Sequence, residues 1–260
     1  MESTIYPLMA ELEKRHWWFI GRRNIISKVL DGFMARLPGA KVLDVGCGTG
    51  GNLALFSQYG AVFGVEVDDD ACRIAKQKQV GTIIKRDFLS DQLPFEEETF
   101  DLIALIDVLE HIEQHKEALC KVTSYLKKRG YLVLTVPAFS FLWSTHDEWH
   151  HHKRRYTRYE ICNLLETAGM RVVYSSYFHF WFFPLIAVIR AIQAKTKIFA
   201  NRKEVSMPNY YVNKILTAIF LTERFFIGKV KLPFGVSIIA LAQKADQVYS
   251  HVHVIENNAK

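Results

Sequence analysis

Short apolar runs alternate with amphipathic segments between residues 41 and 137, and this alternation limits the fold more than any other feature of the chain. Each run is almost continuously hydrophobic and too short for a helix, which is typical of strands buried on both faces of a parallel sheet. The intervening segments have helical spacing, so the pattern predicts a doubly wound α/β fold. The five predicted strands are KVLDVG (41–46), AVFGVEV (61–67), TIIKRD (82–87), FDLIALID (100–107) and GYLVLTVP (130–137), with a helix following the fourth strand through Lys128.

The pattern changes after residue 137. There the sequence predicts a helix (159–169), a strand (170–177), a mostly helical and aromatic-rich stretch (179–230) and a closing strand (235–244). Residues 5–37 also have helical spacing, and Pro38-Gly39 ends them. We therefore divide the chain into an N-terminal helical cap (1–38), a core (39–178), a helical insert (179–232), the last core strand (233–245) and a flexible tail (246–260).

Charge and cysteine content set broad limits on partners and compartment. The net charge of +6 is modest, so it does not require nucleic acid, and phosphate or lipid headgroups would suit it equally well. The four cysteines form no CxxC pair and no signal-peptide pattern is present, which predicts a reducing, cytoplasmic setting. The longest apolar run, FHFWFFPLIAVI (178–189), is shorter than the ~18–20 residues of a spanning helix. We interpret it as a buried or interfacial helix.

The loop after the first strand, VLDVGCGTGGNL (42–53), permits two interpretations. Gly46-x-Gly48-x-x-Gly51 matches the dinucleotide fingerprint of a dehydrogenase. Asp44-x-Gly46-x-Gly48-x-Gly50 matches a loop that binds S-adenosylmethionine (SAM). The glycine spacing alone does not choose between them.

Carboxylates at the ends of four strands favour SAM. In an open parallel sheet, ligands bind at the carboxyl ends of the strands, where this chain has Asp44, Glu66, Asp87 and Asp107. Glu66 follows Gly46 by twenty residues, the spacing of an acid that binds ribose hydroxyls in either cofactor. An acidic rim would repel the pyrophosphate of a dinucleotide, whereas it complements the sulfonium and ammonium groups of SAM.

Four motifs in order, VLDVGCGTG, GVEVDDDA, RDFLSDQLPFEEETFDLI and DVLEHI, resemble the class I, Rossmann-like SAM-dependent methyltransferases over about residues 38–137. The resemblance implies a seven-stranded, mostly parallel sheet with an antiparallel last strand. It assigns the methionine end of the cofactor to Asp44 and the glycine loop, and the ribose to Glu66. The residues it implies for cofactor binding are Asp44, Gly46, Cys47, Gly48, Gly50, Glu66, Val67, Asp87, Phe88 and Asp107.

Two basic, aromatic motifs flank this core and predict the acceptor side. HWWF-x-GRR (16–23) and FLWSTHDEWHHHKRRYTRYEI (141–161) resemble a subgroup met among bacterial polysaccharide and lipid-linked genes. From them we expect substrate contacts from Trp18, His151, Arg154, Arg155 and Tyr156. We expect His152 to be catalytic, together with Asp107 and His111 of the DVLEHI motif. Each of these could instead be structural. His146, Asp147 and His150–His152 match no closed zinc set, so no metal is predicted. The basic residues of the N-terminal helical segment are expected on the face away from the core (Arg15, Arg22, Arg23, Lys28).

Together these features predict a SAM-dependent methyltransferase that acts, at oxygen, on a small-molecule or lipid- or saccharide-linked acceptor. The alternatives are a non-catalytic SAM-binding protein and an NAD-dependent oxidoreductase. Nucleic acid is not an expected partner, because DVLE replaces the Asn/Asp-Pro-Pro-aromatic segment of base-flipping enzymes. Aromatic and basic residues over 178–203 predict peripheral contact with the inner face of a membrane, with a helical lid or a dimer interface as competing roles. No oligomeric state is predicted.

Overall fold

Seven strands form one sheet in the computed structural model, which describes residues 5–196 and 206–245. The strand order is β3-β2-β1-β4-β5-β7-β6, and β7 runs antiparallel to both of its neighbours, β5 and β6. The other pairings are parallel, which confirms the predicted Rossmann-like topology. The strands are β1 (Lys41–Val45), β2 (Ala61–Glu66), β3 (Thr82–Lys85), β4 (Phe100–Ile106), β5 (Leu126–Pro137), β6 (Met170–Phe178) and β7 (Ser237–Lys244).

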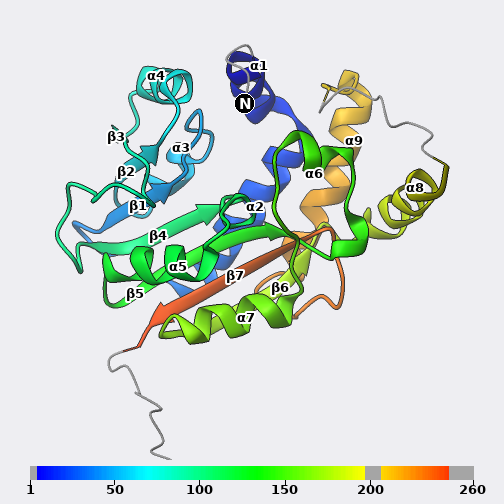
Figure 1. Cartoon of the computed structure of the whole chain (residues 1–260). Helices are drawn as coiled ribbons and strands as arrows, with labels where there is room; N and C mark the ends of the chain where they lie inside the picture. The colour runs from blue at the N-terminus through cyan, green and yellow to red at the C-terminus, as the bar shows by residue number, and fades with distance from the viewer. Residues whose placement is uncertain (1–4, 197–205, 246–260) are drawn as a thin grey trace, which may run out of the picture.

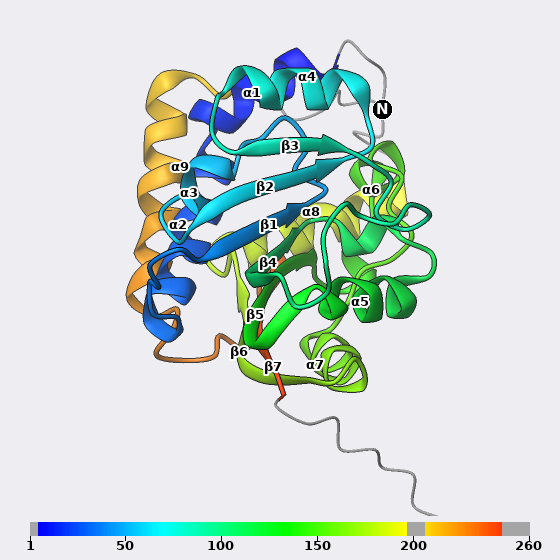
Figure 2. The same cartoon turned by 90° about the vertical axis from the view of Figure 1, so that its left-hand side faces the viewer.

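Helices cover both faces of the sheet. In Figure 2, α2 and α9 lie on one side of it and α5 and α7 on the other. The longer helices are α1 (Ile5–Arg15), α2 (Trp17–Phe33), α4 (Asp69–Gln77), α5 (His115–Ser124), α7 (Arg158–Thr167), α8 (Phe183–Thr196) and α9 (Tyr210–Thr222). The short helical turns are α3 (Leu53–Phe56), η1 (Leu109–His111), η2 (Ser140–Leu142), α6 (Thr145–Trp149) and η3 (Glu223–Phe225).

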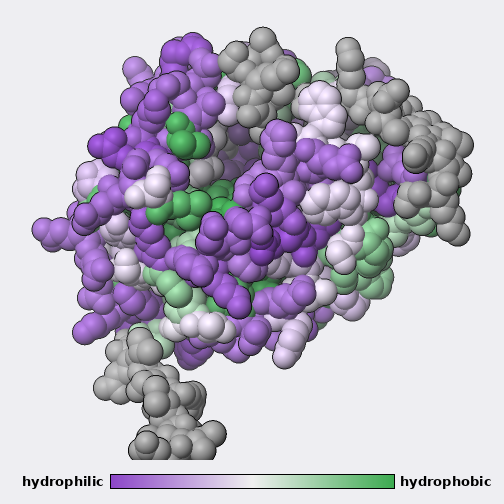
Figure 3. Space-filling model, viewed as in Figure 1, coloured by the Kyte–Doolittle hydropathy of each residue, from purple (hydrophilic) through white to green (hydrophobic). Residues whose placement is uncertain are grey.

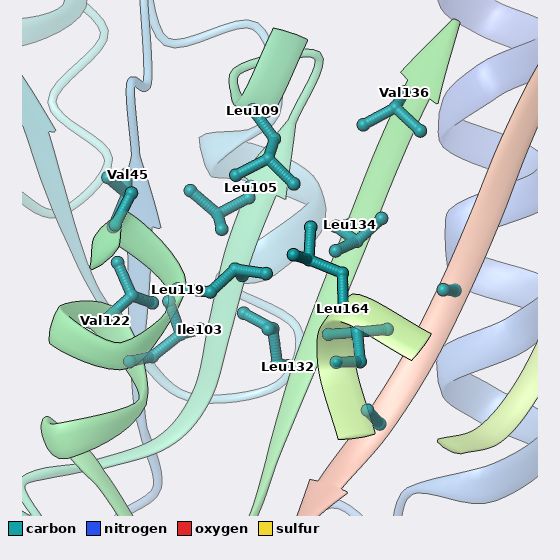
Figure 4. Packing of buried hydrophobic residues seen from close by; sticks show 14 of the residues in the cluster. Val45, Ile103, Leu105, Leu109, Leu119, Val122, Leu132, Leu134, Val136 and Leu164 are labelled. Carbon is teal, nitrogen blue, oxygen red and sulfur yellow. The ribbon is translucent and has the colours of Figure 1, made fainter. Parts of the chain in front are cut away.

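Two hydrophobic clusters hold these layers together. Alternate side chains of β4 belong to one cluster and to the other. Ile103 and Leu105 point to the α5/α7 face, where Leu119 and Leu164 pack against them (Figure 4). Leu102, Ala104 and Ile106 belong to the cluster on the opposite face, which also contains four apolar residues of α2: Ile25, Ile26, Val29 and Leu30. Because successive strand residues face opposite sides of a sheet, one continuously apolar strand feeds two cores.

The prediction that the helix after the fourth strand extends through Lys128 is wrong. The chain forms η1, then α5, which ends at Ser124, and β5 begins at Leu126. Leu126 is fully buried and pairs with Phe100 of β4 before a register shift. Burial of Leu126 and its strand pairing therefore outweigh the helical propensity of the following lysines.

The helix expected over 178–189 also begins later than predicted. Phe178 ends β6, and α8 begins at Phe183. The carboxylate of Glu223, on η3, accepts hydrogen bonds from the backbone N–H groups of His179, Phe180 and Trp181, at 2.7, 2.7 and 3.3 Å. These bonds satisfy the backbone of a non-helical turn, so the aromatic run crosses from sheet to insert without forming a helix.

The insert packs onto the N-terminal helical segment. Phe220 of α9 is fully buried against Gly21 of α2, where an added Cβ would lie 2.1 Å from the phenyl ring. Figure 1 shows α8 and α9 at one end of the sheet, near the ends of β5 and β6. Within the described residues, no helix has both the length and the apolar character needed to cross a bilayer. Part of the predicted basic stretch, residues 197–205, and the predicted tail, 246–260, lie outside the described residues.

Candidate active site

A cavity of about 640 Å³ lies at the carboxyl ends of β1, β4 and β5. The strand order reverses between β1 and β4, and this switch point is where open α/β sheets bind ligands. The glycine loop, the start of α2, η1, the loop around residues 146–155 and α8 contribute to its wall. The cavity therefore joins the predicted cofactor loop to the predicted acceptor segment.

The glycine loop turns sharply at the end of β1. Gly46 and Gly48 have φ angles of +68° and +54°, and an added Cβ on Gly46 would lie 2.7 Å from a methyl group of Val108. The N–H groups of Gly46 and Cys47 donate to the carbonyl of Val65 on β2, at 2.8 and 3.1 Å. Gly46, Cys47 and Gly48 line the cavity. A side chain at Gly48 would point into open space, so the loop leaves room for a ligand.

Buried polar atoms beside this loop fit the amino-acid end of SAM. Asp44 is fully buried, burial raises its pKa to about 8, and its Oδ2 has no hydrogen-bond partner among the described residues. Oδ1 of Asn52, a residue that lines the cavity, also has no hydrogen-bond partner among the described residues. Because a buried oxygen without a donor is costly, a bound ammonium group would stabilise this arrangement.

Glu66 is held at the end of β2. Its carboxylate accepts hydrogen bonds from the backbone N–H groups of Gly48 at 2.9 Å, Val67 at 2.8 Å and Asp68 at 3.0 Å. These bonds fix the carboxylate beside the glycine loop, where the ribose of SAM would be expected.

The residues expected around the adenine lie outside the lining of the cavity, as do Asp44, Gly50 and Glu66. Val67 is exposed, and Phe88 packs against the α5/α7 cluster. Asp87 accepts hydrogen bonds from the N–H of Leu89 and from the hydroxyl of Ser90, both at 2.9 Å. The pKa of Asp87 is lowered, and the hydrogen bond from Leu89 is the largest cause. The side chains expected around the adenine lie past the ends of β2 and β3.

Gly51, which made the loop ambiguous in sequence, has a structural role. The carboxylate of Glu13, on α1, lies over it, so an added Cβ would be 2.4 Å from the Cδ of Glu13. Glu13 also accepts from the hydroxyl of Thr49 at 2.5 Å and pairs with Lys78 at 3.3 Å. Because Gly51 has no side chain, the N-terminal helices can pack on the loop. This packing explains the glycine at position 51 without a bound dinucleotide.

Arg22 was expected on an exposed basic face, and that expectation is wrong. It is buried, its Nη1 donates to Asp107, and it lines the cavity. Its positive charge lowers the pKa of Asp44 and Glu110, although burial raises both more strongly. The guanidinium therefore lies among the carboxylates of the rim and partly neutralises them. The paired arginines of the HWWF-x-GRR motif were the only sequence signal for it.

Four histidines line the acceptor side of the cavity: His111, His146, His150 and His152. Burial is the first cause that lowers the pKa of His111, to about 4, of His146, to about 3, and of His150. At neutral pH these three rings are therefore uncharged, and each has one nitrogen lone pair available.

Asp147 organises this wall from behind. It is fully buried and accepts hydrogen bonds from Nδ1 of His152 at 2.9 Å and from Nε and Nη2 of Arg155 at 2.8 and 3.0 Å. Burial alone would raise its pKa, but the bonds from His152 and Arg155 hold that pKa well below its usual range. Because Asp147 is ionised, Nδ1 of His152 is the donor and Nε2 carries the lone pair.

The predicted acceptor residues separate into two groups. Trp18, Asp107, His111, His152 and Arg155 line the cavity. The other three do not, and each has a different environment. His151 is exposed, Arg154 donates to Glu113 at 3.2 Å, and the buried hydroxyl of Tyr156 bonds Nδ1 of His115 at 2.8 Å. Lining residues without a predicted role include Glu13, Trp17, Arg22, Glu110, His150, His179 and Arg190.

A family model described as "Methyltransferase domain" matches residues 18–175. A demethylmenaquinone methyltransferase of Tropheryma whipplei is 31% identical over 130 residues, which are 49% of this chain and 50% of that protein. A ubiquinone biosynthesis O-methyltransferase of Glaesserella parasuis is 31% identical over 108 residues, which are 38% of this chain and 46% of that protein. The chain spans about half the length of the curated relatives it matches.

A solved structure agrees with this match. The SAM dependent methyltransferase from Archaeoglobus fulgidus superposes with a TM-score of 0.53 at 18% identity, covering 85% of this chain and 94% of that one, which shows the same fold. Since the family model covers more than half of the sequence and the sheet has the expected topology, this chain belongs to the methyltransferase domain family, among the class I SAM-dependent methyltransferases.

Proposed function

We propose that this chain transfers a methyl group from SAM to an oxygen atom of a small, lipid-linked acceptor. The observation that carries the proposal is the single cavity that connects the Gly46–Gly48 loop with the histidine wall. Bound SAM would supply an electrophilic methyl group. The protein then has to align the acceptor and exclude water.

The described residues can perform these tasks. Asp44 would bind the methionine end of SAM, and Glu66 would bind its ribose. His152 would accept the proton of the acceptor hydroxyl on Nε2, because its Nδ1 hydrogen is directed at Asp147. Arg190 of α8 lines the far wall and would face an anionic group of the acceptor.

The apolar surface next to the cavity supports a lipid-linked acceptor. Ile186 and Ile189 of α8 line the cavity, while Leu185 and Val188 of the same helix are 62% and 56% exposed. Figure 3 shows hydrophobic side chains gathered over α8, beside a mostly hydrophilic surface. Further large apolar side chains are exposed on α9, η3 and the following turn: Tyr210, Tyr211, Val212, Ile215, Ile219, Phe225, Phe226 and Val230. An acceptor with an apolar chain could pass from this surface into the cavity.

Basic residues on the same elements suit an anionic membrane. Lys214, Arg224, Lys229 and Lys231 are exposed on or after α9. Apolar side chains flanked by cations are typical of segments that lie in the interface of an anionic bilayer. Two of the curated relatives are named as a demethylmenaquinone methyltransferase and a ubiquinone biosynthesis O-methyltransferase, and we infer an acceptor of similar amphipathic character.

Incubation of the protein with methyl-labelled SAM and cell extract tests the proposed reaction. We expect label in the lipid fraction, at a position stable to mild base because the product is a methyl ether. Label confined to protein or saccharide would contradict the acceptor class. Absence of SAM binding by titration calorimetry would contradict the function as a whole.

If α8 contacts the membrane, negative charges introduced on its exposed apolar side chains should weaken binding to anionic vesicles. The double variant Leu185→Glu and Val188→Glu should lower co-sedimentation with vesicles of phosphatidylglycerol at least about tenfold, because two carboxylates would have to enter the interface. Leu37→Glu, at an exposed leucine beyond the end of α2, is the matched control and should bind like the unaltered protein. Equal binding of all three proteins, or binding that is independent of anionic lipid, would contradict the contact.

Asp44 predicts that SAM affinity rises with pH. Its pKa of about 8 in the free protein, raised by burial, means that it is mostly protonated at pH 6–7. Because the SAM ammonium group binds the carboxylate form, binding must release a proton, and affinity should rise by close to tenfold between pH 6 and pH 7. Calorimetry in two buffers of different ionisation enthalpy measures this release, and Asp44→Asn should abolish it. An affinity that is constant across this range would contradict the assignment.

A further inference from the structure

Three metal-ligating side chains converge on the acceptor side of the cavity. Glu110 and His111 are on η1 and His152 lies in the loop after α6, and their nearest ligand atoms all lie within 4.8 Å of one another. All three residues line the cavity. The N–H of Lys153 donates to the carbonyl of Glu110 at 2.8 Å, which holds the two segments together. Of these three residues, only His152 belongs to the segment 146–152 that matches no closed zinc set in the sequence.

The carboxylate of Glu110 has no partner that explains its burial. The residue is 1% exposed, and neither oxygen has a hydrogen-bond partner among the described residues. A buried carboxylate in this state is expensive unless a cation or a donor reaches it. Burial raises the pKa of Glu110 more than the charges of Arg22 and Arg155 lower it, and these arginines form their ion pairs with Asp107 and Asp147. The two histidine rings nearest its oxygens offer lone pairs.

His152 is oriented as a metal ligand usually is. Its Nδ1 donates to the buried Asp147, which in turn is held by two hydrogen bonds from Arg155. A carboxylate behind the ring fixes the tautomer, and it makes Nε2 a better donor of electrons to a metal. The ring of His111 stands nearly perpendicular to that of His152, with the centroids 4.8 Å apart.

We propose that Glu110, His111 and His152 bind one divalent transition-metal ion, with Zn²⁺ preferred over Mg²⁺. Two imidazoles and one carboxylate form a donor set that suits Zn²⁺ and its neighbours, whereas Mg²⁺ prefers oxygen ligands. Three protein ligands leave at least one coordination position for the acceptor oxygen. The catalytic part of this inference rests on the proposed function, while the binding of the ion does not.

The ion would act on the acceptor hydroxyl. Coordination would lower the pKa of the bound oxygen, so its proton would pass to water. The new oxygen–carbon bond forms as the carbon–sulfur bond breaks and its electron pair stays on sulfur. The products are the methyl ether, S-adenosylhomocysteine and one proton. Acceptors with two adjacent oxygens, such as catechols, would chelate the ion and be preferred.

The general base proposed above, the Asp147–His152 pair, would act only in protein without the metal. That account explains the orientation of His152, but it leaves both oxygens of Glu110 unsatisfied. A bound metal ion would give the carboxylate oxygens of Glu110 a partner, and it would bind the Nε2 lone pair of His152 that the general base would otherwise use. Direct measurement of metal binding separates the two accounts.

Titration calorimetry of the full chain, freed of metal with a chelator, tests the site with ZnCl₂ and then with MgCl₂. We expect one Zn²⁺ per chain with a dissociation constant in the micromolar range or below, and Mg²⁺ binding at least about 100-fold weaker. Glu110→Gln and His152→Ala should each weaken Zn²⁺ binding at least about 100-fold. The matched controls are Glu113→Gln and His115→Asn, at residues of the same segment outside the cluster and the cavity lining, and they should bind like the unaltered protein.

SAM binding by the same variants keeps this test separate from that of the proposed function. We expect Glu110→Gln and His152→Ala to bind SAM, and Glu110→Gln to melt as the unaltered protein does. His152→Ala should melt at a lower temperature, because it removes a hydrogen bond to the buried Asp147, so its loss of Zn²⁺ binding is judged at a temperature where it is folded and binds SAM. Absence of stoichiometric Zn²⁺ binding, or equal binding by all variants, overturns the site. Full methyl transfer by metal-free protein overturns its catalytic role and favours the general base. Zn²⁺ binding without any SAM binding would overturn the proposed function and leave the metal site in place.

Discussion

Replacing Asp147 with asparagine is expected to lower the free energy of unfolding by about 3–5 kcal/mol. The carboxylate is fully buried and accepts from both His152 and Arg155, and the side chain of Arg155 is only 5% exposed. Asparagine would leave the guanidinium buried without an anion, which is far more costly than the loss of a surface ion pair. Chemical denaturation followed by circular dichroism measures the change.

The neighbouring residue provides the control for this prediction. Glu148 is exposed on the same short helix, and Glu148→Gln should change stability by less than about 0.5 kcal/mol. The pKa of Asp147 is depressed in the folded state, so its contribution is present above the unfolded value of about 3.9 and is lost as pH falls below it. The variant should therefore lose less stability than the unaltered protein between pH 5 and pH 3. A variant as stable as the control would show that the buried pair contributes little.

Replacing Glu66 with alanine is expected to weaken SAM binding at least about 100-fold, which corresponds to about 2.7 kcal/mol. Hydrogen bonds from ribose hydroxyls to a carboxylate contribute about 1.5–3 kcal/mol each. The variant also loses the acceptor for the N–H of Gly48, so the loop would no longer be held in its binding conformation. Calorimetric titration with SAM and with S-adenosylhomocysteine measures both losses.

Two further variants separate these contributions. Glu66→Gln keeps an oxygen for the N–H of Gly48 but removes the charge, so its affinity should lie between those of the alanine variant and the unaltered protein. Glu97→Ala removes an exposed carboxylate before β4 and should leave the affinity unchanged. An alanine variant at Glu66 that binds SAM normally would show that the ribose lies elsewhere.

The cofactor half of the site follows from local sequence. Apolar runs of strand length, each ending in an acid or a glycine, predict parallel strands, and parallel strands bring their carboxyl ends to one edge of the sheet. For this reason the positions of Asp44, Glu66 and Asp107 could be anticipated without a structure. The confirmed parallel part of the sheet depends on the same repeating pattern.

The acceptor half could not be predicted in this way. Arg22 follows the helical pattern of an exposed residue, yet α2 packs so that its guanidinium reaches Asp107 at the end of β4. Arg154 and Arg155 are adjacent, but one pairs with Glu113 and the other with the buried Asp147. Local periodicity reports which face of an element is apolar, and it does not report which distant residue a long polar side chain will meet.

The sequence by itself determined the fold class and the edge of the sheet at which the predicted cofactor loop lies. Those features arise from residues close together in the chain, through strand periodicity and loop geometry. Only the tertiary structure decided that Gly51 accommodates Glu13, that Arg22 is buried among the carboxylates, and that Glu110 and His111 meet His152. These contacts join segments far apart in the chain, and they depend on how the N-terminal helices and the loop after β5 pack over the sheet.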